Sequence, residues 1–295
     1  MSSMPELNEL SLLKKELARL QAENDTLRPL QYDQVTGLLV RRLFDRDAAH
    51  MVASGAGHLL TIDVDYLSLW NDLYSHSVGD TVLRNLAVVL RVNSLKHVVR
   101  WYRTGGDEVN GLLIGSQREA KAILKRARRP FERLAVVRNQ LLPPSFIWGM
   151  CSVGRADHAM RELEDACPKV AVLSERDRLT ARKQFLLQIA DRRAYTAKIY
   201  RRALLLAQML QTDPNTFENM GRWLFKGLGA IDRQAIVTLA DTNGSERAAM
   251  ARVMIREMYQ NQTDALQKQS EASPGVDARD VAFRRIVLHA SLQSL

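Results

Sequence analysis

The segment DVDYLSLWNDLYSHSVGD occupies residues 63–80, and YRTGGDEV follows it at residues 102–109. The first segment overlaps the end of HLLTIDV at residues 58–64. This apolar run predicts a buried strand that ends in acidic residues. Residues 98–103 and 108–114 predict two further strands. The turn Thr104-Gly105-Gly106-Asp107 joins them, and its glycines accept positive φ without steric cost. The pattern therefore predicts acidic groups at the ends of neighbouring strands.

The flanking segments extend this pattern into a mixed α/β order. Residues 80–92 and 120–134 carry apolar side chains at helical spacing, and residues 146–153 (FIWGMCSV) predict another strand. From about residue 162 onward the pattern is almost entirely helical. The sequence therefore predicts an α/β fold with a mixed sheet flanked by helices, followed by an all-α C-terminal region.

The N-terminal segment, residues 1–32, predicts a coiled-coil dimerisation helix. Its seam residues alternate three and four positions apart: Leu10, Leu13, Leu17, Leu20, Asn24 and Leu27. A buried asparagine on such a seam pairs best with its own copy in a two-stranded interface. The alternative is an amphipathic helix packed on its own domain. The strongly polar opposite face favours the homodimer.

Composition narrows the class of protein. The chain has 295 residues, 46% hydrophobic and 25% charged, which is ordinary for a globular protein. No stretch is long and apolar enough to cross a membrane, and the N-terminus lacks the pattern of a secretory signal. Cys151 and Cys167 are the two cysteines, so neither a disulfide scaffold nor a cysteine metal cluster is expected. These features predict a cytoplasmic protein without a membrane partner.

The formal net charge of +9 favours anionic partners such as nucleotides. A well-solvated arginine-rich surface explains the same charge. Against this basic background, acidic residues gather at residues 63–65, 71–72, 79–80 and 107–108. Carboxylate oxygens are hard ligands that suit Mg²⁺, which also binds substrate phosphates. Taken singly, each acid is better explained as a surface or capping residue.

The order of these blocks resembles the GGDEF family of nucleotide cyclases. That family shows D-x-D, ND, GH and GD in this order, followed by R-x-GGDEF. Upstream, DQVTGL at residues 33–38 and RRLF at residues 41–44 resemble its opening, and ADRRAYTAK at residues 190–198 resembles its closing helix. Four blocks in order are specific, whereas a lone GGDE is weak. The resemblance covers residues 33–202 and implies a diguanylate cyclase, which condenses two GTP into cyclic di-GMP and two pyrophosphates across a dimer interface.

The resemblance also implies a metal site that holds Mg²⁺ or Mn²⁺. Its ligands would be Asp63, the backbone carbonyl of Val64, Asp107 and Glu108. Asp107 and Glu108 would be the catalytic residues, and Glu108 would help to deprotonate the ribose 3′-hydroxyl. Metal-bound oxygens lose protons more easily, and the metal neutralises the leaving pyrophosphate.

The GTP-binding residues implied by the resemblance fall into three groups. Asn71 and Asp80 would read guanine, because a carboxylate can accept hydrogen bonds from both N1–H and the exocyclic amine. Asp80 reads alternatively as a helix N-cap. The phosphates would meet the remaining groups: Arg103, Gly105, Gly106, Lys198 and Arg202. Lys198 and Arg202 lie four residues apart on a predicted helix, where a solvated basic face is the alternative.

Several positions depart from the family pattern. Ser68 replaces a lysine, Ser75 replaces the glycine before His76, and Val109 replaces the final phenylalanine of the signature. These departures motivate a second hypothesis, a catalytically degenerate module that binds GTP or cyclic di-GMP. The family's inhibitory R-x-x-D is replaced by residues 96–99 (KHVV), so feedback through that site is not expected.

The predicted division has three parts: residues 1–32, a catalytic domain at 33–205 with a helical insertion at about 155–189, and a helical domain at 206–295. The last part would serve regulation or bind a protein partner. No recognised nucleic-acid motif supports nucleic-acid binding, which therefore ranks last.

Overall fold

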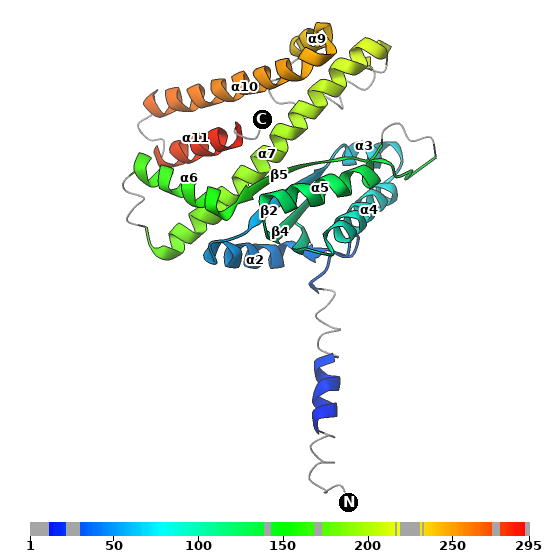
Figure 1. The fold of residues 1–295 in the computed structure, drawn as a ribbon, viewed down its shortest axis with the longest axis vertical. Coiled ribbons are helices and arrows are strands. Elements are labelled where there is room, and N and C mark those ends of the chain that lie inside the picture. The colour runs from blue at the N-terminus through cyan, green and yellow to red at the C-terminus, as the bar shows by residue number, and fades with distance from the viewer. Residues whose placement is uncertain are drawn as a thin grey trace, which may run out of the picture.

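A five-stranded mixed sheet forms the centre of the computed structural model (Figure 1). The structure describes residues 12–21, 30–138, 143–167, 173–215, 217–218, 231, 233–272 and 278–292. The strand order is β1-β3-β4-β2-β5; β1 runs parallel to β3, and the other neighbours are antiparallel. The strands are β1 (Leu39–Val40), β2 (His58–Val64), β3 (Val98–Arg103), β4 (Glu108–Ile114) and β5 (Phe146–Ser152). The predicted α/β class and the three strands at residues 58–64, 98–103 and 108–114 are confirmed.

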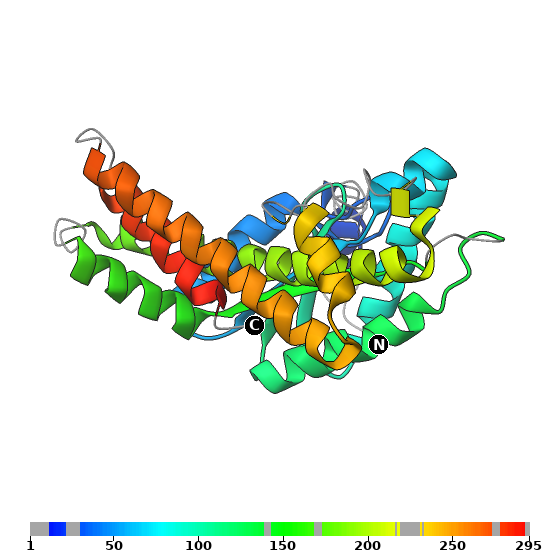
Figure 2. The same ribbon diagram turned by 90° about the horizontal axis from the view of Figure 1, so that it is seen from above.

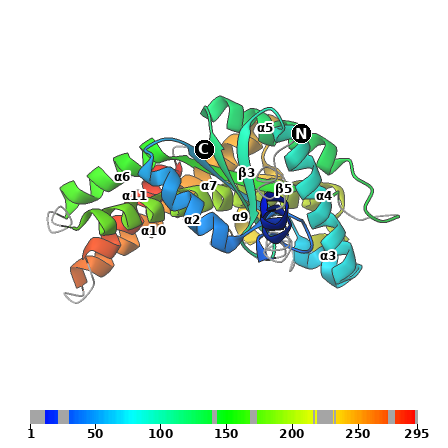
Figure 3. The same cartoon turned by 90° about the horizontal axis from the view of Figure 1, so that it is seen from below.

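Helices cover both faces of the sheet and continue beyond it. They are α2 (Arg41–Ala53), α3 (Leu67–Leu73), α4 (His76–Ser94), α5 (Gln117–Glu132), α6 (Val153–Ala166), α7 (Glu175–Thr212), α9 (Arg233–Asp241), α10 (Gly244–Ala272) and α11 (Ala278–Leu292). Figures 2 and 3 show α10 and α11 side by side, next to α6 and α7.

The sheet separates two hydrophobic cores. Successive side chains of a strand point to opposite faces, so neighbouring residues of β2 enter different cores. Leu60 and Ile62 pack with α3, α4 and α5 on one face. Leu59 packs on the other face with Tyr102 and with α2, α6, α7 and α11. Helices therefore cover each face of the sheet, and the ends of the strands are the part of the sheet that they leave uncovered.

A third core joins the C-terminal helices to the second half of α7. Ile199 and Leu206 of α7 are buried together with Ile236 of α9 and with Ile255 and Tyr259 of α10. Helix α7 has 38 residues and passes through residue 205 without interruption, because its apolar residues stay buried against these helices. The predicted division into domains, including the insertion at about 155–189, stays a prediction.

The N-terminal segment is described only at residues 12–21, which form a helix that stands away from the folded body in Figure 1. Leu13, Leu17 and Leu20 of the predicted seam are exposed on it. Leu10, Asn24 and Leu27 lie outside the described residues. Pairing of this helix with a second copy stays a prediction.

The start of α4 corrects one alternative from the sequence. Ser75 is the N-cap, and its hydroxyl accepts a hydrogen bond from the Val78 amide. The helix begins at His76, so Asp80 lies inside it and the N-cap interpretation of Asp80 is wrong.

Among the described residues, no helix combines the length and apolarity that a bilayer crossing requires.

Replacing Tyr102 with phenylalanine is expected to lower the free energy of unfolding by about 1–2 kcal/mol. The buried Tyr102 hydroxyl donates a 2.8 Å hydrogen bond to Asp47 Oδ2. Burial pushes the Asp47 pKa upward, but hydrogen bonds from Tyr102, Arg46 and Arg100 outweigh it and hold that pKa below 3.8. Stability from an acid with a lowered pKa is present above the unfolded pKa and lost as pH falls through the folded one.

Urea denaturation measures the free energy of unfolding of the wild type and of Tyr102→Phe. The difference between these two free energies should become smaller below about pH 4. Tyr32→Phe is the matched control, because the Tyr32 side chain is exposed. Equal stability of wild type and Tyr102→Phe at neutral pH would contradict the role given to this hydroxyl.

Candidate functional site

The ends of β2 and β4 bring the predicted metal ligands together. Asp63 lies directly opposite Glu108 in the antiparallel register, so their side chains share one face of the sheet. The Val64 amide donates a 3.1 Å hydrogen bond to the Asp107 carbonyl. The turn is closed by the Thr104 amide, which donates to the Glu108 carbonyl at 3.1 Å. All four predicted ligands therefore belong to one strand-end cluster.

A cationic side chain from α7 meets this cluster. Lys198 Nζ lies 2.8 Å from Asp63 Oδ1 and 2.9 Å from Oδ2. Burial raises the Asp63 pKa, and the nearby carboxylates of Asp107 and Asp65 add to this, while Lys198 opposes it. Ionised Asp63 thus depends on positive charge close by.

The donor chemistry of the cluster fits a hard divalent cation. Carboxylate and carbonyl oxygens are the ligands of Mg²⁺. The Lys198 ammonium contacts Asp63, which shows that a positive charge is stable beside these carboxylates. Within the described ranges, no three His, Cys, Asp or Glu side chains already stand in a metal-holding group. Binding of a metal would therefore accompany a rearrangement of these side chains.

Asp65, the second acid of the D-x-D pattern, has a structural role instead. It is buried, its amide donates to the Ser145 carbonyl at 2.9 Å, and its Oδ2 accepts from Ser145 Oγ at 3.0 Å. Arg201 pairs with the same oxygen at 3.3 Å and with Glu132 at 2.8 Å. No motif in the sequence indicated these ion pairs of Arg201.

Arg202 takes a different position from Lys198. Its guanidinium lies 4.6 Å from the ring centroid of Tyr66, and the Arg202 side chain is buried. Tyr66 has φ 59° and ψ 26°, a left-handed conformation that is uncommon for a residue other than glycine. Burial raises the pKa of Tyr66 to about 12. The predicted pair of phosphate ligands is therefore divided between the carboxylate cluster and an aromatic ring.

Arg103 holds the glycine turn in place. Its guanidinium donates to the Gly105 carbonyl at 3.2 Å and to the Gly106 carbonyl at 2.8 Å. It also pairs with Asp33 at 3.1 Å, and Asp33 in turn accepts a 2.8 Å hydrogen bond from the Thr36 amide. A contact of Arg103 with GTP stays a prediction. Asp33 belonged to a recognised block, but nothing local in the sequence indicated its partner 70 positions away.

The predicted guanine readers lie on adjacent helices. Asn71 belongs to α3, and Asp80 belongs to α4. Gly79 is buried, and a Cβ at that position would overlap Asn71 Oδ1. The absence of a side chain at Gly79 therefore lets the Asn71 amide lie beside the residue that precedes Asp80, as a shared base site requires.

Residues 30–166 match the family model described as "Diguanylate cyclase, GGDEF domain". Among curated proteins, the diguanylate cyclase VdcA of Vibrio cholerae is 36% identical over 133 residues, 43% of this chain and 36% of that protein. The diguanylate cyclase DgcZ of Escherichia coli is 37% identical over 79 residues, 26% of each chain. The match thus spans about a third or less of these relatives.

Among solved structures, the coiled coil and GGDEF domain of DgcB from Caulobacter crescentus, in complex with c-di-GMP, is 19% identical with a TM-score of 0.43. The match covers 54% of this chain and 94% of that one. The residues that match the family model include the whole sheet and the strand-end cluster. Residues 30–166 of this chain therefore form a domain of the GGDEF family.

Proposed function

We propose that this protein is a diguanylate cyclase, which joins two GTP into cyclic di-GMP and releases two pyrophosphates. The observation that supports it most is the strand-end cluster, in which Asp63 faces Glu108 and is paired with Lys198. A basic chain that concentrates acids beside a lysine at one sheet edge suits a reaction of metal-bound nucleotides. GTP as substrate places the proposed reaction in the cytoplasm.

In the proposed reaction, Glu108 helps to take the proton from a ribose 3′-hydroxyl. The 3′-oxygen forms a bond to the α-phosphorus of the second GTP, and the bond from that phosphorus to the bridging oxygen of pyrophosphate breaks. Repeating the step with the roles of the two nucleotides exchanged closes the ring. Two phosphodiester bonds form, and two pyrophosphates leave.

Asp63, the Val64 carbonyl, Asp107 and Glu108 would hold Mg²⁺ or Mn²⁺. The ion would supply charge that eases loss of the hydroxyl proton and neutralises the leaving pyrophosphate. Lys198, which pairs with Asp63 in this structure, would bind a phosphate oxygen when the ion neutralises the Asp63 carboxylate. Gly105 and Gly106 leave room for the phosphates to approach the backbone of the turn.

Guanine selection is assigned to Asp80 with Asn71. The Asp80 carboxylate can accept hydrogen bonds from the N1–H and the exocyclic amine of guanine, whereas adenine presents the wrong pattern. The side-by-side arrangement of Asn71 and Gly79 supports this pair.

A homodimer completes the proposal, because each GGDEF domain holds one GTP and the two must face each other. Pairing of the helix in residues 1–32 would raise the effective concentration of one site near the other. The exposed Leu13, Leu17 and Leu20 supply an apolar stripe for that contact.

A second candidate function is a degenerate GGDEF module that binds GTP or cyclic di-GMP without turnover. Two observations favour it. Ser68 stands where the family has a lysine, and the Arg202 guanidinium is buried 4.6 Å from the ring centroid of Tyr66. Fewer cations at the phosphates would weaken transition-state stabilisation more than binding of the base.

Incubation of the full chain with GTP and Mg²⁺, followed by chromatography, separates the two functions. We expect cyclic di-GMP from the wild type, none with ATP as the nucleotide, and a loss of GTP affinity of about tenfold or more in Asp80→Ala. Asp165→Ala is the matched control, because Asp165 is an exposed acid on α6. GTP binding that needs Asp80, without product at any Mg²⁺ or Mn²⁺ concentration, would establish the degenerate module instead.

A further inference from the structure

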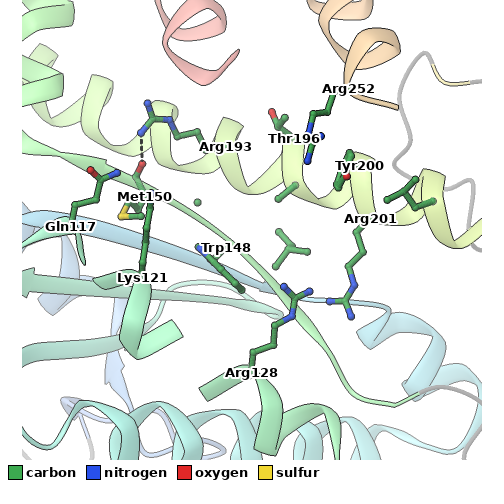
Figure 4. Close-up of a pocket in the computed structure, with 14 residues that line it drawn as sticks. Gln117, Lys121, Arg128, Trp148, Met150, Arg193, Thr196, Tyr200, Arg201 and Arg252 are labelled. Carbon is green, nitrogen blue, oxygen red and sulfur yellow. Dashed lines mark hydrogen bonds between the residues drawn. The ribbon is translucent and has the colours of Figure 1, made fainter. Parts of the chain in front are cut away.

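A cationic pocket of about 580 Å³ lies between α5, β5, α7 and α10 (Figure 4). None of the residues that line it is acidic. Five of them are basic: Lys121, Arg128, Arg193, Arg201 and Arg252. Figure 4 shows these side chains arriving from different elements, with Arg252 reaching in from α10. The C-terminal helices therefore complete a pocket whose other walls belong to the sheet and its neighbouring helices.

The positive charge of this pocket is only partly compensated. Arg128 and Arg201 share the carboxylate of Glu132, each at 2.8 Å, and Arg201 also pairs with Asp65 at 3.3 Å. Lys121, Arg193 and Arg252 form no ion pair with a carboxylate in the part of the chain that the structure describes. Lys121 and Arg252, both exposed, thus bring positive charge to the pocket that no protein carboxylate neutralises and that a bound anion can match.

Arg193 borders the pocket, and its guanidinium is held by the backbone. Two of its nitrogens donate to the carbonyls of Met150 at 2.8 Å and Ala290 at 2.9 Å. Its Nε is buried and has no hydrogen-bond partner among the described atoms. Burial also lowers the pKa of the Arg193 guanidinium.

Two further arginines are held by aromatic rings, which fix their guanidinium groups in the pocket wall. Arg128 lies 5.1 Å from the ring centroid of Trp148, and Arg252 lies 5.5 Å from that of Tyr200. A guanidinium held in this way loses little freedom when it binds, and its planar fork suits the oxygens of a phosphate. The fork suits oxyanions in general, and five cations around one pocket favour an anion of several charges, such as a polyphosphate.

The pocket is separate from the strand-end cluster. Its α7 residues include 193, 197, 200 and 204, which share one face of the helix, whereas Asp63 and Lys198 do not line it. Arg201 connects the two places, because it lines the pocket and pairs with Asp65.

We propose that this pocket binds a small polyphosphate anion, free or esterified as in a nucleoside diphosphate. Its volume lies in the range of small-molecule sites. Because Arg252 belongs to α10 and Lys121 to α5, such a ligand would tie the C-terminal helices to the GGDEF domain.

Isothermal titration calorimetry of the full chain with pyrophosphate and with ADP, in low salt and without divalent metal, tests the proposal. ADP carries the base that the proposed guanine site rejects. We expect binding to wild type, weakened at least about tenfold in Lys121→Ala/Arg252→Ala, since two charge-assisted contacts are lost. Lys125→Ala/Arg256→Ala is the matched control, because it removes a lysine of α5 and an arginine of α10 outside the pocket.

Binding must persist in Lys198→Ala, which separates this pocket from the strand-end cluster. Tighter binding of ADP than of pyrophosphate would assign an esterified ligand, and the reverse would assign a free polyphosphate. No binding of either probe, equal affinity in Lys121→Ala/Arg252→Ala, or loss in Lys198→Ala would overturn the proposal. None of these readouts needs turnover of GTP, so failure of the proposed cyclase activity would leave them intact.

Discussion

Replacement of Gly149 with alanine is expected to lower the free energy of unfolding by about 3 kcal/mol. Gly149 lies in β5, where α7 crosses the sheet. A Cβ there would overlap the carbonyl oxygen of Ala190 and the amide nitrogen of Ala194. Both are backbone atoms, so no rotamer change relieves the overlap, and α7 must move away from the strand.

Urea denaturation followed by circular dichroism measures this effect. Gly154→Ala is the matched control, because Gly154 lies in α6 and a Cβ there meets no atom within 4 Å. Alanine at that helical position should be neutral or stabilise by up to about 1 kcal/mol. A Gly149→Ala midpoint equal to that of wild type would show that α7 does not depend on this close approach.

The displacement in Gly149→Ala should also reach the strand-end cluster. Lys198 is held by the same helix, only four residues after Ala194, and its ion pair with Asp63 spans 2.8 Å. A shift of α7 by even a few tenths of an ångström lengthens this contact. Stability and nucleotide chemistry are therefore expected to fail together.

Replacement of Asp63 with asparagine, or of Glu108 with glutamine, is expected to reduce cyclic di-GMP formation on the order of 10³-fold or more. Each change removes a charge from the proposed metal ligands without changing the shape of the side chain. Glu108→Gln also removes the group assigned to the 3′-hydroxyl proton. Chromatography of reactions with GTP and Mg²⁺ measures the product.

The stability of Asp63→Asn should distinguish a chemical role from a structural one. Burial raises the Asp63 pKa above its ordinary value of 3.8. For an acid with a raised pKa, the stabilising contribution is present below the unfolded pKa and is lost as pH rises through the folded one. An asparagine cannot ionise, so Asp63→Asn should unfold at neutral pH no more readily than wild type.

Asp165→Asn, on the exposed face of α6, is the control for both measurements. Product within tenfold of wild type in Asp63→Asn would contradict its assignment as a metal ligand. A large drop in its thermal midpoint would show that Lys198 pairs with Asp63 mainly to hold the fold.

Strand positions were predictable because local pattern and tertiary environment agree. The strands at residues 58–64, 98–103 and 108–114 end where the sequence placed them, since apolar runs bounded by glycine and acids leave few other pairings. Helix starts were less accurate. The apolar periodicity of α4 becomes clear only near Asp80, whereas the hydroxyl of Ser75 begins the helix four residues earlier.

The candidate site was predictable in its members but not in their partners. Asp63 lies near the end of β2, and Asp107 and Glu108 lie at the start of the adjacent strand β4, so the acidic strand ends marked in the sequence meet. The roles of the cations depend on contacts between distant segments. Arg103 pairs with Asp33 across 70 positions, and Lys198 reaches Asp63 across 135. No periodicity within a single segment carries information of that kind.

The sequence by itself determined the α/β class, the glycine turn, the acidic strand ends and the resemblance to the GGDEF family. These depend on residues close together in the chain, where spacing alone dictates geometry. Only the tertiary structure decided which arginine meets Asp65, where Arg202 lies, and that α5, β5, α7 and α10 enclose a cationic pocket. Those features arise where helices pack on a sheet, and the packing of buried surfaces brings together side chains that the sequence keeps more than a hundred residues apart.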